Sequence, residues 1–374
     1  MKAICNRGAL LDALNVVGQA VQARTPKPIL QCIKLTCGDD RLMLAATDME
    51  IAVRYDDAQV QIESDGQTLI PADKLRDIVR ESMDDTLSIE LKGEQCVIKG
   101  SDSRFTVYTQ NPADFPAVPD FEGEADFEIN GGLLKRLIGK TLFAAAREGT
   151  RYAFNGVLTT LREGSRLMMV STDGRRLAQA SGEVSASGKK KPAKGEKDGP
   201  RAIIPTKALQ LVDKLVGDPE EMVKVQIRPN QVIFATAAAT LTSNLVEGQF
   251  PPFEEVIPKD SDKKMTASCG DLMSAVRRAS LLTTEESKGV RMQFTKEGLK
   301  LTSRSAEAGE AEVNFPCRYE GADLEIGFNP QFLVDALKVT DADEITFEMS
   351  APNRPGLLRG GEDFLYVIMP VNLQ

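Results

Sequence analysis

Apolar residues recur at helical spacing in six short segments of the chain, and runs that alternate apolar and polar residues follow these segments. The helical spacing predicts helices over 7–24, 72–81, 131–148, 206–216, 270–282 and 330–339. The alternating runs predict strands that bury one face. The pattern therefore indicates an α+β fold in which helices cover antiparallel sheets.

This pattern repeats three times along the chain. Segments 68–91, 202–227 and 326–349 each contain an apolar run that ends at a proline, a helix, an acidic turn and an alternating strand. The prolines that mark the same point in each copy are Pro71, Pro205 and Pro330. Because the repeat is one domain long, we expect three similar domains with the limits 1–122, 123–259 and 260–374.

Three other stretches fit between the repeated elements. Residues 114–124 and 249–260 end the first two copies and are rich in proline, so we expect extended connectors between domains. Residues 184–200 break the repeat and are rich in Lys, Gly, Pro and Ser. That composition predicts a disordered loop insertion in the second domain.

A Thr-Asp pair closes the second strand of a predicted strand pair in two copies, as Thr47-Asp48 and as Thr172-Asp173 in "VSTDGRRLAQ". In the third copy, Ser303-Arg304 takes its place. The pair could supply a catalytic carboxylate, an anion site or a tight turn. Two carboxylates capable of acid–base catalysis must converge in one cleft, whereas these belong to different domains. The repeat therefore favours a structural turn at the end of a strand.

The composition of the 374 residues excludes several kinds of chemistry. The chain has no histidine, so it lacks Ser-His-Asp and Cys-His relays and His-Glu zinc motifs. It also lacks the glycine-rich motifs that bind nucleotide phosphates, and we expect no metal and no cofactor. The six cysteines have mostly apolar neighbours and no C-x-x-C pair, which indicates reduced, buried thiols. No segment approaches about 18 uninterrupted apolar residues, so we expect a cytoplasmic protein without a membrane span.

Charge is unevenly distributed along the sequence. The net charge is −9, yet the six predicted helices together carry +6 and the rest of the chain carries −15. Cationic helices in an acidic protein suggest a sheltered basic face suited to phosphates rather than to stacked bases. The alternative is that Lys and Arg are simply good helix formers on solvated faces.

Eight motifs in order carry a resemblance that covers essentially the whole chain. These motifs are "KPILQCIKL", "ATDMEI", "RYAFNGVL", "STDGRRLA", "EGQFPPFEEVIPK", "KGVRMQF", "IGFNPQFLVDAL" and "YVIMPV". Together they resemble the bacterial sliding clamp family, the beta subunit of DNA polymerase III. The resemblance implies three repeated clamp domains, each with two helices packed on antiparallel sheets. It also implies a head-to-tail homodimeric ring whose helices line the hole.

The resemblance further implies a non-catalytic subunit for DNA replication. The ring would encircle duplex DNA without reading its sequence and would tether the replicative polymerase, giving it processivity. The polymerase, the clamp loader and repair proteins would bind through short linear peptides. One alternative is a clamp-like scaffold that binds linear peptides but not DNA, and another is an enzyme that uses Asp173.

The resemblance implies three sets of site residues. The helix cations and neighbours expected at DNA are Arg24, Arg80, Lys135, Arg136, Lys140, Arg147, Tyr152, Lys207 and Arg277. The peptide pocket would comprise Arg151, Phe154, Thr172, Gly174, Arg175, Arg176, Leu177, Pro251, Val256, Val367, Ile368, Met369 and Pro370. In that pocket Arg151 and Arg176 would offer hydrogen-bond donors at the rim.

The third set would close the ring between two chains. We expect the edge strand at 103–108 of one chain to pair with the edge near 305–315 of the other, which satisfies open backbone groups. The residues expected at this dimer interface are Lys74, Arg104, Phe105, Val107, Leu281, Leu282, Glu307 and Glu310. Arg104 would face Glu307 or Glu310. The family pattern is not followed at Glu148, Ala153, Arg175, Glu255 and the Asn-Leu-Gln tail.

Overall fold

A computed structural model describes residues 1–22, 24–57, 59–146, 152–163, 165–186, 198–284 and 289–372. The chain divides into two compact units. The first contains Met1–Leu134, Val184–Lys190 and Lys207–Leu245, and the second contains Lys135–Glu183, Lys191–Thr206 and Val246–Gln374. Each unit therefore holds one end domain of the predicted repeat and part of the middle domain.

Six α-helices lie in the described part of the chain, one pair in each copy of the repeat. They are α1 (Arg7–Val17), α2 (Ala72–Glu81), α3 (Gly131–Leu142), α4 (Thr206–Leu215), α5 (Cys269–Ala279) and α6 (Pro330–Lys338). The first helix of each pair is shorter than the sequence pattern predicts. After α1 the chain tightens into the 3₁₀ turn Gly18–Ala20, and α5 gives way at Ser280.

Polar side chains cap several of these helices. The Asn6 carboxamide accepts from the backbone N–H of Ala9 at 3.0 Å, and the Ser268 hydroxyl accepts from Asp271 at 3.3 Å. The proline marker of the third copy is displaced by one residue. Pro71 is the N-cap of α2, whereas Pro330 is the first residue of α6 and Asn329 is its N-cap. Proline suits both positions because neither needs its N–H.

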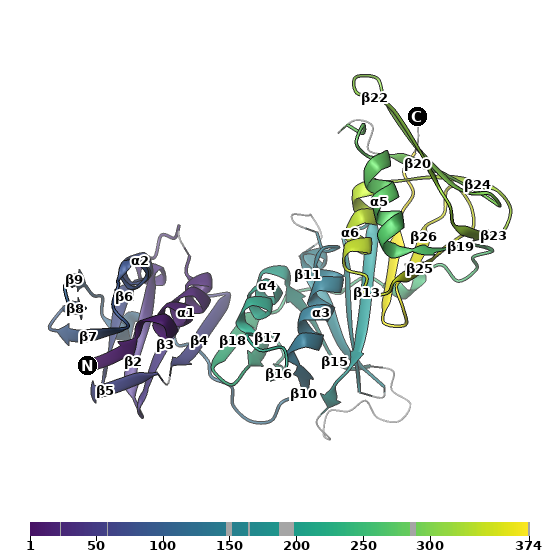
Figure 1. Cartoon of the computed structure of the whole chain (residues 1–374). Helices are drawn as coiled ribbons and strands as arrows, with labels where there is room; N and C mark the ends of the chain where they lie inside the picture. Colours follow the sequence, from purple (N-terminus) through teal and green to yellow (C-terminus); the bar gives the residue numbers. More distant parts are fainter. Residues whose placement is uncertain are drawn as a thin grey trace. The chain divides into compact units, whose positions relative to one another are not determined.

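The first unit contains two antiparallel sheets (Figure 1). One has the order β5-β1-β7-β8-β9 and the other the order β14-β10-β16-β17-β18-β4-β3-β2-β6. The strands of the first are β1 (Lys2–Asn6), β5 (Val60–Ser64), β7 (Thr86–Lys92), β8 (Gln95–Lys99) and β9 (Arg104–Tyr108). Those of the second are β2 (Cys32–Gly38), β3 (Arg41–Thr47), β4 (Ile51–Asp57), β6 (Gly66–Pro71), β10 (Phe127–Asn130), β14 (Ser185–Ala186), β16 (Met222–Ile227), β17 (Gln231–Ala235) and β18 (Ala239–Asn244).

The second unit also contains one nine-stranded sheet and one smaller antiparallel sheet. Its sheets have the orders β15-β11-β12-β13-β27-β26-β25-β19-β23 and β22-β21-β20-β24. The strands of the larger sheet are β11 (Gly156–Arg162), β12 (Arg166–Thr172), β13 (Arg176–Glu183), β15 (Asp198–Pro205), β19 (Lys263–Ser268), β23 (Arg318–Glu320), β25 (Glu344–Met349), β26 (Gly356–Arg359) and β27 (Phe364–Ile368). Those of the smaller sheet are β20 (Val290–Thr295), β21 (Gly298–Ser305), β22 (Gly309–Phe315) and β24 (Leu324–Phe328).

Each nine-stranded sheet joins two copies of the repeat edge to edge. In the first unit β18 pairs antiparallel with β4, and Thr240 lies opposite Arg54. In the second unit β27 pairs antiparallel with β13, and Leu365 lies opposite Gln179. Equivalent positions in the copies are found by counting from the N-cap of each copy's first helix and following the strand pairings across the sheet. By this count Thr240 corresponds to Leu365 and Arg54 corresponds to Gln179, so the two junctions have the same register. The repeat therefore joins its copies in one fixed way.

The cores lie between sheets and helices. The inner faces of α1, α5 and α6 are buried, and so are the facing strand residues. Five of the six cysteines are buried, as the sequence predicts. Burial raises the pKa of the Cys32 and Cys37 thiols to about 11 and that of Cys96 to about 12, which keeps these thiols protonated at neutral pH.

The predicted insertion at 184–200 is only partly a loop. Ser185–Ala186 forms β14 and residues 198–200 begin β15, so both ends belong to strands. Residues 187–197, which carry the lysines, lie outside the described residues.

Candidate functional site

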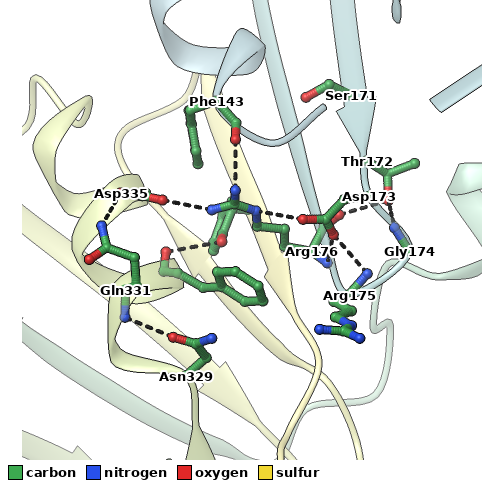
Figure 2. Close-up of polar contacts among 12 residues, drawn as sticks. Phe143, Ser171, Thr172, Asp173, Gly174, Arg175, Arg176, Asn329, Gln331 and Asp335 are labelled. Atoms are coloured by element: carbon green, nitrogen blue, oxygen red, sulfur yellow. Dashed lines mark hydrogen bonds and ion pairs between the residues drawn. The ribbon is translucent and has the colours of Figure 1, made fainter. Parts of the chain in front are cut away.

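The Thr-Asp turn of the second copy is held by its own side chains (Figure 2). The Thr172 hydroxyl donates to the carbonyl of Arg176 at 2.7 Å and accepts from the N–H of Gly174 at 3.0 Å. One carboxylate oxygen of Asp173 accepts from the N–H groups of Arg175 and Arg176 at 2.9 and 3.1 Å. These are the bonds by which Thr and Asp stabilise turns.

The first copy builds the same turn. The Thr47 hydroxyl donates to the carbonyl of Ile51 at 2.9 Å, and Asp48 accepts from the N–H groups of Glu50 and Ile51. The other carboxylate oxygen of Asp48 pairs with Lys207 of α4. The structural-turn prediction is therefore confirmed for both Thr-Asp pairs. In the third copy Ser303 lies at the position of Ser171, one residue away from the expected match.

The guanidinium of Arg176 lies between the turn and two helices (Figure 2). Its Nε donates to Asp173 at 2.9 Å, its Nη1 donates to Asp335 at 2.8 Å, and its Nη2 donates to the carbonyl of Phe143 at 2.8 Å. Its central carbon lies 4.3 Å from the ring centroid of Phe332 and 5.5 Å from that of Phe143. We call these five residues the Arg176 cluster. The side chain of Arg176 is only 12% exposed.

The cluster keeps Arg176 charged. Burial alone would lower the pKa of this guanidinium, but the hydrogen bond that it donates to Asp335 and the neighbouring carboxylate of Asp173 raise the pKa above its ordinary value. Tyr366 lies beside the cluster, and its hydroxyl donates to the carbonyl of Phe332 at 3.0 Å. Burial raises the pKa of that phenol, so it remains a neutral donor.

An apolar cluster covers the other face of the same strands. Because side chains alternate along a strand, Leu177 points away from the face that carries Arg176. Leu177 pairs with Val367 across β13 and β27, and both belong to a buried group that includes Phe250 and Phe253. The tail after β27 is held here because the N–H of Met369 donates to the carbonyl of Arg175 at 2.9 Å.

Two of the predicted peptide residues, Leu177 and Val367, come together on this face, whereas Ile368 lies opposite Arg176 on the other face. Leu177 and Val367 are buried, while Met369 and Val256 are 39% and 45% exposed. The remaining described members are Phe154, Thr172, Gly174, Arg175, Pro251, Ile368 and Pro370. Arg151 lies outside the described residues. Arg176 was expected as a rim donor, and in the structure each of its three nitrogens donates one hydrogen bond within the Arg176 cluster.

The cations expected at DNA differ in exposure. Arg24, Arg80, Arg136, Lys207 and Arg277 are exposed and Lys135 is half-buried. Arg147 lies outside the described residues, as does the side chain of Tyr152. The prediction is wrong for Lys140, whose side chain is 6% exposed. Its ammonium is paired with Asp341 at 2.7 Å and lies 5.9 Å from the ring centroid of Phe364, so it stabilises the fold.

The two strands expected to close the ring are both sheet edges. β9 is the last strand of the five-stranded sheet, and β22 is an edge of the four-stranded sheet. On β9, Phe105 is 39% exposed and Val107 is half-buried. Near β22, Leu281 is 77% exposed and Leu282 is half-buried. The charged members Lys74, Arg104, Glu307 and Glu310 are exposed, and Glu310 pairs with Arg304 of its own chain at 2.9 Å.

No pattern in the sequence singles out Phe143, Phe332 or Asp335. Each lies in or beside a helix whose apolar pattern predicts core packing. A guanidinium at a strand start and a carboxylate 159 residues away can be matched only when the fold is known.

Two absences apply to the described residues only. None of their helices has the length and apolar character needed to cross a membrane. In the same part of the chain, no three or more Cys, Asp or Glu residues converge in a way that could hold a metal ion.

Sequence profiles of known families match nearly the whole chain. They are the N-terminal, central and C-terminal domains of the DNA polymerase III beta subunit, over residues 1–119, 128–252 and 254–372. The beta sliding clamp of Pseudomonas putida is 34% identical over 373 residues, which is 98% of each chain. A Pseudomonas aeruginosa sliding clamp bound to griselimycin has a TM-score of 0.93 at 31% identity, and the Bacillus subtilis clamp has 0.94 at 28%. Both cover each chain completely.

The repeated helix pairs and the edge-joined antiparallel sheets define the class of DNA sliding clamps, processivity factors that are not enzymes. Within that class, the chain belongs to the DNA polymerase III beta subunit family of bacteria.

Proposed function

We propose that two copies of this chain close head to tail into a ring, with β9 of each copy pairing with β22 of the other. The observation that supports this proposal is the repeat of edge pairing inside the chain. β18 and β27 each join a strand equivalent to β22, whereas β9 and β22 themselves have a free edge among the residues that the structure describes. An open edge invites pairing, and a two-fold symmetric dimer pairs both edges at once.

The repeat also suggests the register of this contact. Arg104 occupies on β9 the position that Thr240 has on β18, and Glu312 occupies on β22 the position that Arg54 has on β4. Thr240 and Arg54 lie opposite each other, and the second internal junction has the same register. Arg104 therefore faces Glu312 of the partner subunit, rather than Glu307 or Glu310 as first expected.

Apolar contacts complete this interface. Phe105 occupies the position of Leu241 and Tyr366, which are both 0% exposed in the internal junctions. Leu281 occupies the position of Phe143, whose ring lies 5.7 Å from that of Tyr366. Ring closure thus buries Phe105 against Leu281 of the partner subunit, as the internal junction buries its equivalents.

Within the ring, cations that lie on the helices or follow them attract duplex DNA through its phosphates. Arg24, Lys135, Arg136, Lys207 and Arg277 supply this attraction, which does not depend on base sequence. The pairing of Lys207 with Asp48 weakens the attraction of Lys207 for phosphates. Topological linkage retains the ring, so weak contacts that allow sliding are sufficient. We also propose that the chain has three domains, with limits at 1–122, 123–259 and 260–374, and that it works in the cytoplasm.

The apolar face around Leu177 and Val367 receives linear peptides from the polymerase and other partners. Its exposed members Met369 and Val256 offer apolar contact, and Arg175 offers hydrogen-bond donors at the edge. A related clamp from Pseudomonas aeruginosa has been solved with bound griselimycin. We propose that griselimycin binds the same apolar face of this chain, so it serves as a probe of the peptide site.

A charge swap tests the register. Arg104→Glu places two carboxylates opposite each other and should raise the dimer dissociation constant about tenfold or more. Adding Glu312→Arg restores opposite charges and should recover most of the affinity, as measured by sedimentation equilibrium. The matched control combines Arg104→Glu with Glu307→Arg and should give no recovery. Recovery with Glu307→Arg, and none with Glu312→Arg, would refute the register.

A further inference from the structure

The peptide site and the Arg176 cluster share one pair of strands. Arg176 lies opposite Ile368, and the next pair along the ladder is Leu177 with Val367. The guanidinium lies on one face of these strands, and the apolar cluster that contains Leu177 and Val367 lies on the other. Contacts that fix the strands on the Arg176 face therefore also fix the orientation of Leu177 and Val367 on the opposite face.

Arg176 connects three elements that lie far apart in the sequence (Figure 2). Asp173 belongs to the β12–β13 turn, the Phe143 carbonyl follows the last residue of α3, and Asp335 belongs to α6. The Phe143 carbonyl is one of the acceptors that a helix end leaves without a helical partner, and a cation is favoured there. Asp335 is itself oriented by Gln331, which donates to it at 2.6 Å.

The first copy of the repeat supports a joining role for this turn. Its Asp48 reaches the second helix of the next copy directly through Lys207. At the second junction the equivalent helix is α6, which has Gln331 at the position of Lys207 and presents Asp335, four residues further on, near the turn. Two carboxylates cannot attract each other, so a cation between them is required, and Arg176 provides it. The two junctions thus achieve the same connection with different charges.

We propose that Arg176 is a positioning residue for partner binding. It locks α6 and the end of α3 onto the β12–β13 turn, and so holds the β13–β27 wall against which a peptide packs. It does not donate to the peptide. This proposal rests on the proposed peptide site. It adds that α6 helps to hold the β13–β27 strands of that site in place.

The two possible roles of Arg176 predict opposite effects of a change at Asp335, which lies on the far side of the guanidinium. If Arg176 only positions the wall, Asp335→Asn loosens α6 and weakens ligand binding about tenfold, within the range found for coupling through packed networks. If Arg176 donates to the ligand, Asp335→Asn frees the guanidinium and leaves the affinity unchanged or improves it.

The test measures griselimycin affinity by calorimetry with the full-length dimer. We expect Asp335→Asn to raise the Kd about tenfold, Arg176→Met to raise it at least as much, and the double variant to match Arg176→Met alone. That lack of additivity follows because Asp335 acts only through Arg176. Arg176→Lys keeps the charge but cannot reach all three acceptors, so it should recover only part of the affinity.

A matched control is Asp363→Asn, which removes a carboxylate from an exposed pair with Arg166 in the same unit. It should leave the Kd unchanged. An unchanged Kd for Asp335→Asn, or additive losses in the double variant, would overturn the positioning role even if the melting temperature fell. If the unaltered protein failed to bind griselimycin, the peptide site itself would be refuted instead. Should Arg176→Met not fold, Asp335→Asn and Arg176→Lys still decide between the two roles.

Discussion

Phe105→Glu should convert the dimer into monomers at micromolar concentration. Phe105 lies on the free edge β9, and its equivalents in the two internal junctions are completely buried. A carboxylate in that position would be buried without a partner on ring closure, which costs about 3–5 kcal/mol per site. Each ring has two such sites, so the dimer dissociation constant should rise by at least about a thousandfold. Sedimentation velocity across a concentration series measures this change.

The matched control replaces an exposed apolar residue far from both free edges. Met222 is 44% exposed on β16, an interior strand of its sheet. Met222→Glu should leave the dimer intact. A Phe105→Glu protein that sedimented as a stable dimer would show that β9 does not close the ring.

Removal of residues 369–374 should abolish griselimycin binding, with a loss of about a hundredfold or more, and leave the dimer intact. The bond from the Met369 N–H to the Arg175 carbonyl holds the tail at the β12–β13 turn, and the bond from the Val371 N–H to the Gly327 carbonyl holds it at β24. Met369 is an exposed apolar side chain beside the buried Leu177 and Val367, as expected of a residue that anchors a ligand. Calorimetry gives the affinity and sedimentation gives the oligomeric state.

Point variants separate the side chain from the tail. Met369→Glu should reproduce much of the loss without shortening the chain. Met49→Glu is the control, because Met49 is a 53% exposed methionine on the equivalent turn of the first copy. It should have no effect. Griselimycin binding that survived both Met369→Glu and the truncation would refute this assignment of the peptide site.

Much of the fold could be predicted because the repeat supplies three observations of each element. All six helices lie where the apolar spacing indicates them, and the two Thr-Asp turns have equivalent hydrogen bonds. The helix ends could not be predicted as well. Cationic and apolar residues beyond Val17 continue the helical spacing, but the chain tightens into a 3₁₀ turn at Gly18.

The sequence predicts the packing of apolar residues around the proposed site better than it predicts the partners of charged residues. Leu177 and Val367 are apolar in the sequence and pack together in the structure. Arg176 and Lys140 look like solvent-facing cations in the sequence, yet Lys140 is buried, Arg176 is mostly covered, and each contacts an acid and an aromatic ring. Their partners lie 159 and 201 residues further along the chain, and helical or strand periodicity carries no information about contacts at that distance.

The central claim is that the protein stays on DNA by encircling it. The most direct test loads the dimer onto nicked circular duplex DNA with a clamp loader, removes free protein, and then linearises half of the sample with a restriction enzyme. Gel filtration at moderate salt should recover the protein with the circles and show its loss from the linear DNA, because only the free ends let a ring slide off. Equal retention on circular and linear DNA would contradict encirclement.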